Sequence, residues 1–288
     1  MFKTQNLTIF ENHFPANNIS DLIIYHNGRQ QCLPGEKNVP CVQSHYLFNL
    51  IIRGKGVLRV DNSVYHLSGG RGFLVQPGQF YQCTADTADP WEYIWVGFGG
   101  ESAKDMLYNS RLIHSNPIYA SDAWEQLYEY MASSVTAVRQ GAPGTLVYCQ
   151  GMLLLIIAHL LSKTMLIHEP RDLTQYSDIQ QDYIRRAILY IQEHLSSFFT
   201  VDDVASFLGL NRSHFSRIFT RICGIAPSRF IENYRLDNAW HILRHTDMPI
   251  AKIGQEVGYR DPAYFTRRFQ ERYGTSPSVI RESGNWSE

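Results

Sequence analysis

Residues 213–219 read Ser-His-Phe-Ser-Arg-Ile-Phe, and residues 263–269, fifty positions later, read Ala-Tyr-Phe-Thr-Arg-Arg-Phe. Both copies continue through a glycine to a Pro-Ser pair, and each is preceded by a short apolar segment that ends at Gly209 or Gly258. Self-similarity of this kind indicates a repeated structural unit. A short helix, a glycine break and a second helix predict a helix-turn-helix in each copy.

The second helix of each copy has a polar, basic face. If its two phenylalanines point inward, the 3.6-residue period places serine, threonine and arginine side chains on the opposite side. Such groups donate hydrogen bonds to base edges and phosphates. A basic face can also be a merely solvated surface, but two copies in register favour DNA binding. The candidate DNA contacts are Arg212, Ser213, His214, Ser216, Arg217, Arg221, Ala263, Tyr264, Thr266, Arg267 and Arg268.

The C-terminal hundred residues resemble the DNA-binding domain of the AraC/XylS-type transcription regulators. The resemblance rests on Val201-x-x-Val204-Ala205, Ile250-x-x-Ile253-x-x-x-Val257-Gly258-Tyr259, Tyr264-Phe265-x-x-x-Phe269 and Gly274-x-x-Pro277. It implies two helix-turn-helix units joined by one long helix, here Pro227 to His245, which would enter major grooves one DNA turn, ~34 Å, apart. The base-contacting positions that it implies are Ser213, Ser216, Arg217, Ala263, Tyr264, Thr266 and Arg267.

Charge is divided along the chain. Residues 183–281 hold fourteen Lys/Arg against nine Asp/Glu, whereas residues 1–182 hold twelve against sixteen. The basic part is therefore the nucleic-acid end. Because 288 residues exceed one comfortable core, we expect domains at 1–167 and 183–288, joined by a polar linker at 168–182.

Three features of the sequence bear on the compartment and the cofactors of the protein: its N-terminus, its cysteines and its apolar runs. The first six residues contain no apolar run, which argues against a signal peptide. Five cysteines without a C-x-x-C spacing argue against a disulfide framework or a zinc site. The most apolar segment, Met152 to Leu161, is shorter than the ~20 residues of a membrane span. We expect a cytoplasmic protein with no cofactor, no metal and no membrane segment.

Residues 46–98 contain short runs of β-branched and aromatic residues, separated by turn signals such as Pro77-Gly78. Short strands at this spacing predict an antiparallel barrel or sandwich. The stretch also resembles the cupin-like sugar-sensing domain of arabinose-type regulators. The expected fold is α+β, with an N-terminal cupin-like β-barrel and two helices, and a C-terminal all-α domain with two helix-turn-helix units. A catalytic cupin needs a histidine cluster to hold metal, but His45 and His66 stand alone, so we expect no enzyme.

The candidate ligand-binding residues are Arg53, Tyr93, Trp95, Tyr46 and Tyr25. The resemblance implies sugar contacts for the first three, although Tyr93 replaces a histidine there. Aromatic faces stack on sugar rings, and a guanidinium donates paired hydrogen bonds. In the alternative, Trp91, Tyr93 and Trp95 fill the barrel core and Arg53 forms a salt bridge in a turn. The stretch Pro90 to Phe98 resembles regulators of oligosaccharide operons in Gram-positive bacteria, such as multiple-sugar or raffinose regulators, so an α-galactoside is the first sugar to consider.

Two helices are expected between the barrel and the linker, at Ser121 to Arg139 and Gly144 to Met165. The resemblance implies a homodimer formed through this pair, within residues 121–165. The alternative is a helix pair that packs only on its own barrel.

These features together predict a ligand-responsive transcription regulator. The resemblance implies activation, with promoter DNA, a sugar effector and RNA polymerase as partners. Allosteric coupling of ~1–3 kcal/mol would link sugar binding to DNA binding. Two other hypotheses remain: a constitutive DNA-binding protein whose barrel only dimerises, and a sugar-modifying cupin enzyme, which would need converging carboxylates or metal ligands.

Overall fold

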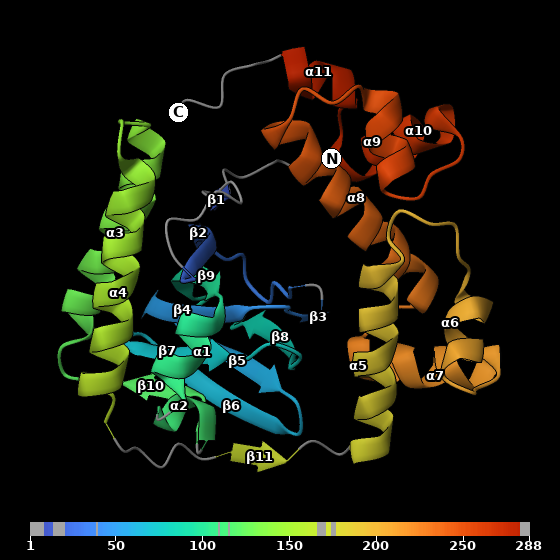
Figure 1. Cartoon of the computed structure of the whole chain (residues 1–288). Coiled ribbons are helices and arrows are strands. Elements are labelled where there is room, and N and C mark those ends of the chain that lie inside the picture. The colour runs from blue at the N-terminus through green and yellow to red at the C-terminus, as the bar shows by residue number, and fades with distance from the viewer. Residues whose placement is uncertain are drawn as a thin grey trace. The chain divides into compact units, whose positions relative to one another are not determined.

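A computed structural model of the chain describes residues 9–13, 21–38, 40–108, 110–114, 116–165, 171–173 and 177–282. The chain divides into two compact units, Met1–Gln175 and Tyr176–Glu288 (Figure 1). The first six residues, on which the expectation of no signal peptide rests, lie outside the described residues, as do parts of the predicted linker.

The N-terminal unit contains two antiparallel sheets. One has six strands in the order β1-β2-β9-β4-β7-β10, and the other has five in the order β11-β6-β5-β8-β3. This arrangement confirms the predicted all-antiparallel sheet domain. The strands are β1 (Ile9–His13), β2 (Ile23–Gln31), β3 (Cys41–Val42), β4 (Tyr46–Arg53), β5 (Lys55–Val60), β6 (Ser63–Ser68), β7 (Arg71–Val75), β8 (Phe80–Ala85), β9 (Glu92–Gly99), β10 (Ile118–Ala120) and β11 (Arg171–Leu173).

The six-stranded sheet is buried on both faces. Successive side chains of a strand point to opposite sides, so Phe48 and Leu50 of β4 pack toward the helices, in one core with Ile94. Leu47 and Ile51 of the same strand belong to a second core that is shared with the five-stranded sheet. The helices of this unit are α1 (Glu101–Leu107), α2 (Arg111–His114), α3 (Trp124–Gln140) and α4 (Thr145–Lys163). The sheet thus separates a helix-covered side from the interior of the barrel.

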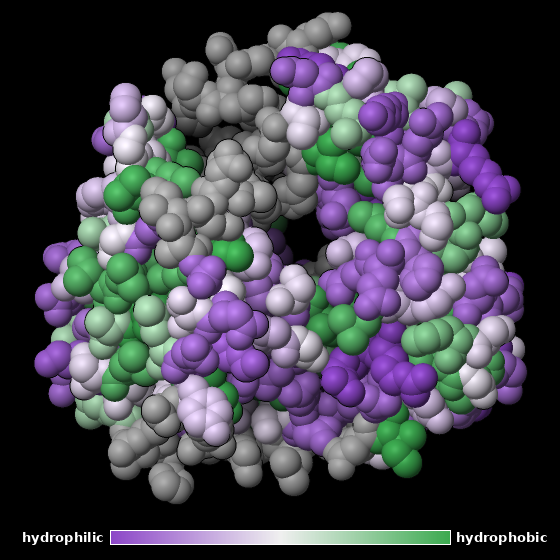
Figure 2. Space-filling model, in the orientation of Figure 1, coloured by the Kyte–Doolittle hydropathy of each residue, from purple (hydrophilic) through white to green (hydrophobic). Residues whose placement is uncertain are grey.

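Helix α4 lies within the expected helix, Gly144 to Met165, and extends beyond the ten-residue apolar segment at both ends. By length and composition alone it could cross a membrane, with a mean hydropathy of 1.8 over an 18-residue window. In the structure 39% of that window is buried, and Leu153, Ile157 and Leu160 pack in the core against the six-stranded sheet. A helix that covers a sheet passes the same hydropathy test, but the buried face explains only part of the composition, because the outer face of α4 is apolar as well (Figure 2).

The structure gives regular elements to much of the predicted linker. Strand β11 pairs with β6, which places residues 171–173 at the edge of the five-stranded sheet. The last five residues of the predicted linker belong to helix α5 (Asp178–Glu193), and Ser177 caps this helix by accepting a hydrogen bond from the Gln180 amide.

The C-terminal unit contains two helix-turn-helix pairs, as the repeat predicts (Figure 1). Both second helices end at a glycine with φ of +75°, a conformation that a Cβ disfavours. The paired phenylalanines are buried: Phe215 and Phe219 in the first pair, and Phe265 and Phe269 in the second. The helices are α6 (Val201–Phe207) and α7 (Arg212–Cys223), the connecting α8 (Pro227–His245), α9 (Ile250–Glu256) and α10 (Pro262–Tyr273), and α11 (Pro277–Glu282).

Candidate nucleic-acid interface and ligand cavity

The outer face of α7 carries the predicted contacts of the first unit. Ser213 and Arg217 are exposed and Ser216 is half-buried. Arg217 Nη2 lies 3.0 Å from His214 Nδ1, and Arg212 forms an exposed ion pair of 2.8 Å with Asp202 of α6. No acidic residue occurs on α7 itself. The face is therefore suited to an electronegative groove.

The outer face of α10 carries fewer hydrogen-bond donors than that of α7. Ala263 and Tyr264 are exposed, and the Arg267 guanidinium lies 5.2 Å from the centre of the Tyr264 ring. Thr266 Oγ1 donates to the carbonyl of Pro262 at 2.9 Å, within the helix. The side chain of Arg267 is 66% exposed, and its ion pair with Glu271 is long, at 4.0 Å. Tyr264 and Arg267 are thus the long exposed side chains on the outer face of α10, where the sequence predicts DNA contacts.

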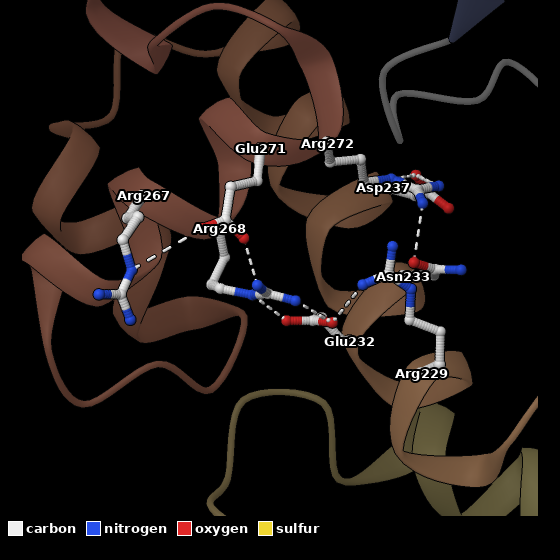
Figure 3. A network of polar contacts seen from close by, with 8 residues as sticks. All are labelled: Arg229, Glu232, Asn233, Asp237, Arg267, Arg268, Glu271 and Arg272. Carbon is white, nitrogen blue, oxygen red and sulfur yellow. Dashed lines mark hydrogen bonds and ion pairs between the residues drawn. The ribbon is translucent and has the colours of Figure 1, made fainter.

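Arg268, predicted as a DNA contact, points instead to α8 (Figure 3). Its Nε and Nη2 bind the two carboxylate oxygens of Glu232, the second at 2.7 Å, and its Nη1 binds Glu271. The pKa of Glu232 is lowered, chiefly by the hydrogen bond from Arg268. Its donors therefore bind carboxylates and hold α10 on the connecting helix α8, whereas the prediction placed Arg268 on the outer face.

A second group of polar contacts between α10 and α8 lies one turn further along α10 (Figure 3). Arg272 Nη2 donates to Asp237 Oδ1 at 2.6 Å and its Nη1 donates to Asn233 Oδ1 at 2.8 Å. Helix α7 meets α8 through an edge-to-face contact of 5.2 Å between the rings of Phe219 and Phe230. Helix α10 also packs on α8 through the rings of Trp240 and Phe269, 5.8 Å apart, so the ion pairs are an addition to an apolar contact that both halves of the repeat share.

A cavity of about 280 Å³ lies within the barrel. Its wall presents indole, phenol, amide, imidazole and thiol groups, and contains no Asp, Glu, Lys or Arg among the described residues. The lining residues are His26, Gln30, Asn38, Gln43, Leu47, Asn49, Ile51, Phe73, Tyr81, Cys83, Trp91, Tyr93 and Trp95. The structure thus places two of the predicted ligand residues, Tyr93 and Trp95, on one wall.

Hydrogen bonds fix the aromatic wall of this cavity. Trp95 Nε1 donates to His26 Nδ1 at 3.1 Å, and Tyr93 Oη donates to Gln30 Oε1 at 2.9 Å. Asn49 differs from these residues, because its buried Nδ2 has no hydrogen-bond partner in the described structure. A buried donor without an acceptor is uncommon, and here it belongs to a residue of the cavity wall.

The other three predicted ligand residues lie outside the cavity. Arg53 Nε binds Glu92 Oε2 at 2.7 Å on the helix-facing side of the sheet, which is the salt bridge that the alternative hypothesis expected. Burial alone would raise the pKa of Glu92, but hydrogen bonds from Arg53 and Arg29 outweigh it and lower that pKa. Tyr46 stacks on Phe98 in the helix-facing core, and Tyr25 is 38% exposed.

Sequence reasoning missed the polar residues of the cavity. Asn49 carried a usable signal, because it is the only polar residue between Leu47 and Ile52 in a strand that is otherwise apolar. His26 and Gln30 lie on β2, which contains too many polar residues for its sequence to predict a buried strand.

The fold and these two sites define a two-domain DNA-binding regulator with a ligand cavity. Residues 25–139 match the AraC-like ligand binding domain and residues 204–283 match a helix-turn-helix domain. The chain belongs to the AraC family of transcription regulators.

Three curated relatives match along most of their length. The Msm operon regulatory protein of Streptococcus mutans is 28% identical over 96% of this chain and 98% of its own. The lactose operon transcription activator of Staphylococcus xylosus is 26% identical, covering 85% and 89%. The raffinose operon transcriptional regulatory protein RafR of Pediococcus pentosaceus is 28% identical, covering 89% and 92%.

Proposed function

We propose that the chain activates a carbohydrate-utilisation operon in response to a neutral sugar bound in the barrel cavity. The observation that carries the proposal is the wall formed by Tyr93, Trp95 and Asn49: two aromatic faces beside a buried amide donor without a partner. A sugar ring offers C–H groups to the aromatic faces and hydroxyl oxygens to the amide. A phosphorylated sugar would bring charge into a cavity whose wall has no Lys or Arg, which is unfavourable.

The proposed ligand is a galactoside, and first an α-galactoside. Two relatives are named for the raffinose and lactose operons, and both sugars carry a terminal galactosyl unit. A cavity of about 280 Å³ is at the small end of ligand pockets, ~300–1,000 Å³, which favours recognition of one terminal ring. Activation is proposed because one relative is named as a transcription activator.

The proposal includes a homodimer formed through the outer face of α4. Residues at positions 147, 151, 154, 158 and 161 follow the alternating spacing of four and three that is typical of a helix–helix seam. Val147, Leu154 and Leu161 of this seam are 58%, 48% and 45% exposed. Two protomers would place four helix-turn-helix units on half-sites. We further propose a cytoplasmic, non-enzymatic protein that contacts RNA polymerase at its promoter.

Fluorescence anisotropy of labelled DNA from upstream of the chain's own gene and its neighbours tests this proposal. Methyl α-galactoside should change the affinity for DNA and raise the melting temperature, because a ligand that binds only the folded state stabilises it. Galactose 6-phosphate is the matched control and should do neither. If no sugar has an effect while DNA binding is tight, the constitutive hypothesis replaces the proposal. Turnover of a saccharide would instead support the enzyme hypothesis.

A further inference from the structure

A second concave site lies in the C-terminal unit, with a volume of about 440 Å³. It is formed by the first half of α8, the turn after α9 and the start of α10. Its lining contains three arginines and one glutamate, which gives a net charge of +2. The lining residues are Ser228, Arg229, Ile231, Glu232, Arg235, Tyr259, Tyr264 and Arg268. Tyr264 also belongs to the predicted DNA-contacting face of α10, so the site borders that face.

Two donors in this site are buried without partners. Tyr259 is 8% exposed, and its hydroxyl has no hydrogen-bond partner among the described residues. The Nε of Arg235 is likewise unpaired, although its other nitrogens donate to the carbonyls of Gly258 and Ser197. A buried unsatisfied donor costs ~1–3 kcal/mol. The hydroxyl of Tyr259 therefore lowers the stability of the free protein, and an acceptor that arrives from outside would remove the cost.

The packing of Tyr259 does not explain its hydroxyl. The ring lies 5.3 Å from that of Phe265 and 6.0 Å from that of Tyr264, in contacts that a phenylalanine would make equally well. Burial raises the pKa of Tyr259, so the phenol remains protonated and keeps an O–H to donate. A partner that accepts this hydrogen bond must carry acceptor atoms.

The net charge of +2 in the lining favours an anion as that partner. Glu232 is neutralised by Arg268, which binds both of its oxygens. Arg229 adds one bond of 3.1 Å to the same carboxylate and is 59% exposed, so it can turn to a new partner without leaving Glu232 unpaired. Phosphate supplies both the charge and the acceptor oxygens.

We propose that this site binds a phosphate of the DNA backbone, with Arg229 and the hydroxyl of Tyr259 as the contacting groups. The hydroxyl is closed off from solvent in the free protein, so entry of the phosphate requires a neighbouring side chain of the site to turn aside. A contact to phosphate carries no sequence information, but it fixes the position of α10 in its groove.

Tyr259→Phe distinguishes a phosphate-binding role from a structural one. The first role predicts weaker DNA binding without loss of stability, and the second predicts loss of stability. Removal of an unsatisfied buried hydroxyl should leave the melting temperature unchanged or raise it. Loss of the phosphate contact should weaken binding roughly 10-fold, both to a duplex selected from a randomised pool and to an unselected duplex. The matched control is Tyr273→Phe, whose hydroxyl donates to Asp237 at 2.7 Å outside this site. That variant should lose stability and keep its affinity for DNA.

Arg229→Gln gives an independent measurement on the full-length protein. The slope of the logarithm of the binding constant against the logarithm of salt concentration should fall by about 1, the value for one lost phosphate contact. Inorganic phosphate at matched ionic strength distinguishes a free anion from DNA. If it stabilises the wild type but not Tyr259→Phe, while both bind DNA equally, the occupant is free phosphate and the DNA assignment is wrong. Wild-type DNA affinity in Tyr259→Phe without any phosphate effect would also overturn the proposal.

Discussion

Arg268 of α10 binds both carboxylate oxygens of Glu232 on α8, a residue 36 positions earlier in the chain. The pair joins the second helix of the second helix-turn-helix pair to α8, which connects the two pairs. Arg267, its neighbour in the sequence, is 66% exposed on the outer face. Two adjacent arginines of one motif therefore have separate roles, and the first experiments should distinguish them.

Arg268→Ala should lower the free energy of unfolding, because it leaves Glu232 partly buried with one weaker partner. The side chains of Arg268 and Glu232 are 24% and 18% exposed, so we expect a loss of roughly 1–2 kcal/mol. Arg267→Ala is the matched control and should change stability by less than about 0.5 kcal/mol. Urea denaturation of the full-length variants measures both. Equal stability of the two variants would show that the ion pair contributes nothing.

The contribution of this ion pair should depend on pH in one direction. The pKa of Glu232 is lower in the folded protein than its ordinary value, so its stabilisation is complete above the unfolded pKa of ~4.3 and is lost as pH falls through the folded pKa. Wild type should be more stable than Glu232→Gln at neutral pH, and the difference should shrink below about pH 4.3. A difference that persists unchanged in acid would contradict this assignment.

Arg217→Ala should relax base preference in the first unit. Arg217 is exposed on α7, and its loss should cost roughly 1–3 kcal/mol on selected DNA and less on an unselected duplex. Anisotropy titrations at fixed salt on both duplexes give the comparison. Equal losses on the two duplexes would mean that Arg217 contacts only phosphate.

Trp95→Ala and Arg53→Ala should behave oppositely in sugar binding. Trp95 forms part of the cavity wall, whereas Arg53 is 70% exposed and paired with Glu92 outside the cavity. We expect the first variant to lose the sugar-induced rise in melting temperature and to keep DNA affinity, and the second to keep both. A lost sugar response in Arg53→Ala would restore the original assignment of Arg53 as a ligand residue.

Leu154→Glu should separate the protomers if α4 forms the dimer seam. Leu154 is 48% exposed, so the variant can fold, but a carboxylate in an apolar seam would be buried without a partner. Analytical ultracentrifugation should show a monomer, whereas Lys163→Glu, at the end of the same helix and outside the seam, should remain a dimer. A monomeric wild type would contradict the proposed dimer directly.

Some parts of the fold were accessible from sequence because their signals are local. The bounds of α8 agree with the expected helix, and Asp261 caps α10 ahead of Pro262 as its residue type favours. Strand β2 and the pairing of β11 with β6 gave no such signal, because strand pairing joins segments that are far apart in the chain.

The sequence by itself determined the repeated helix-turn-helix units and the basic outer face of α7. Periodicity and glycine positions specify these features over a few residues, so no distant contact is needed to recognise them. Only the tertiary structure decided which polar groups face the cavity and which arginines are already paired. Arg53 and Arg268 have the side chain of a ligand or DNA contact, but Glu92 and Glu232 occupy them, and those partners lie 39 and 36 positions away in the chain. The residue type of a side chain limits what it can bind, whereas the fold decides which partner lies next to it.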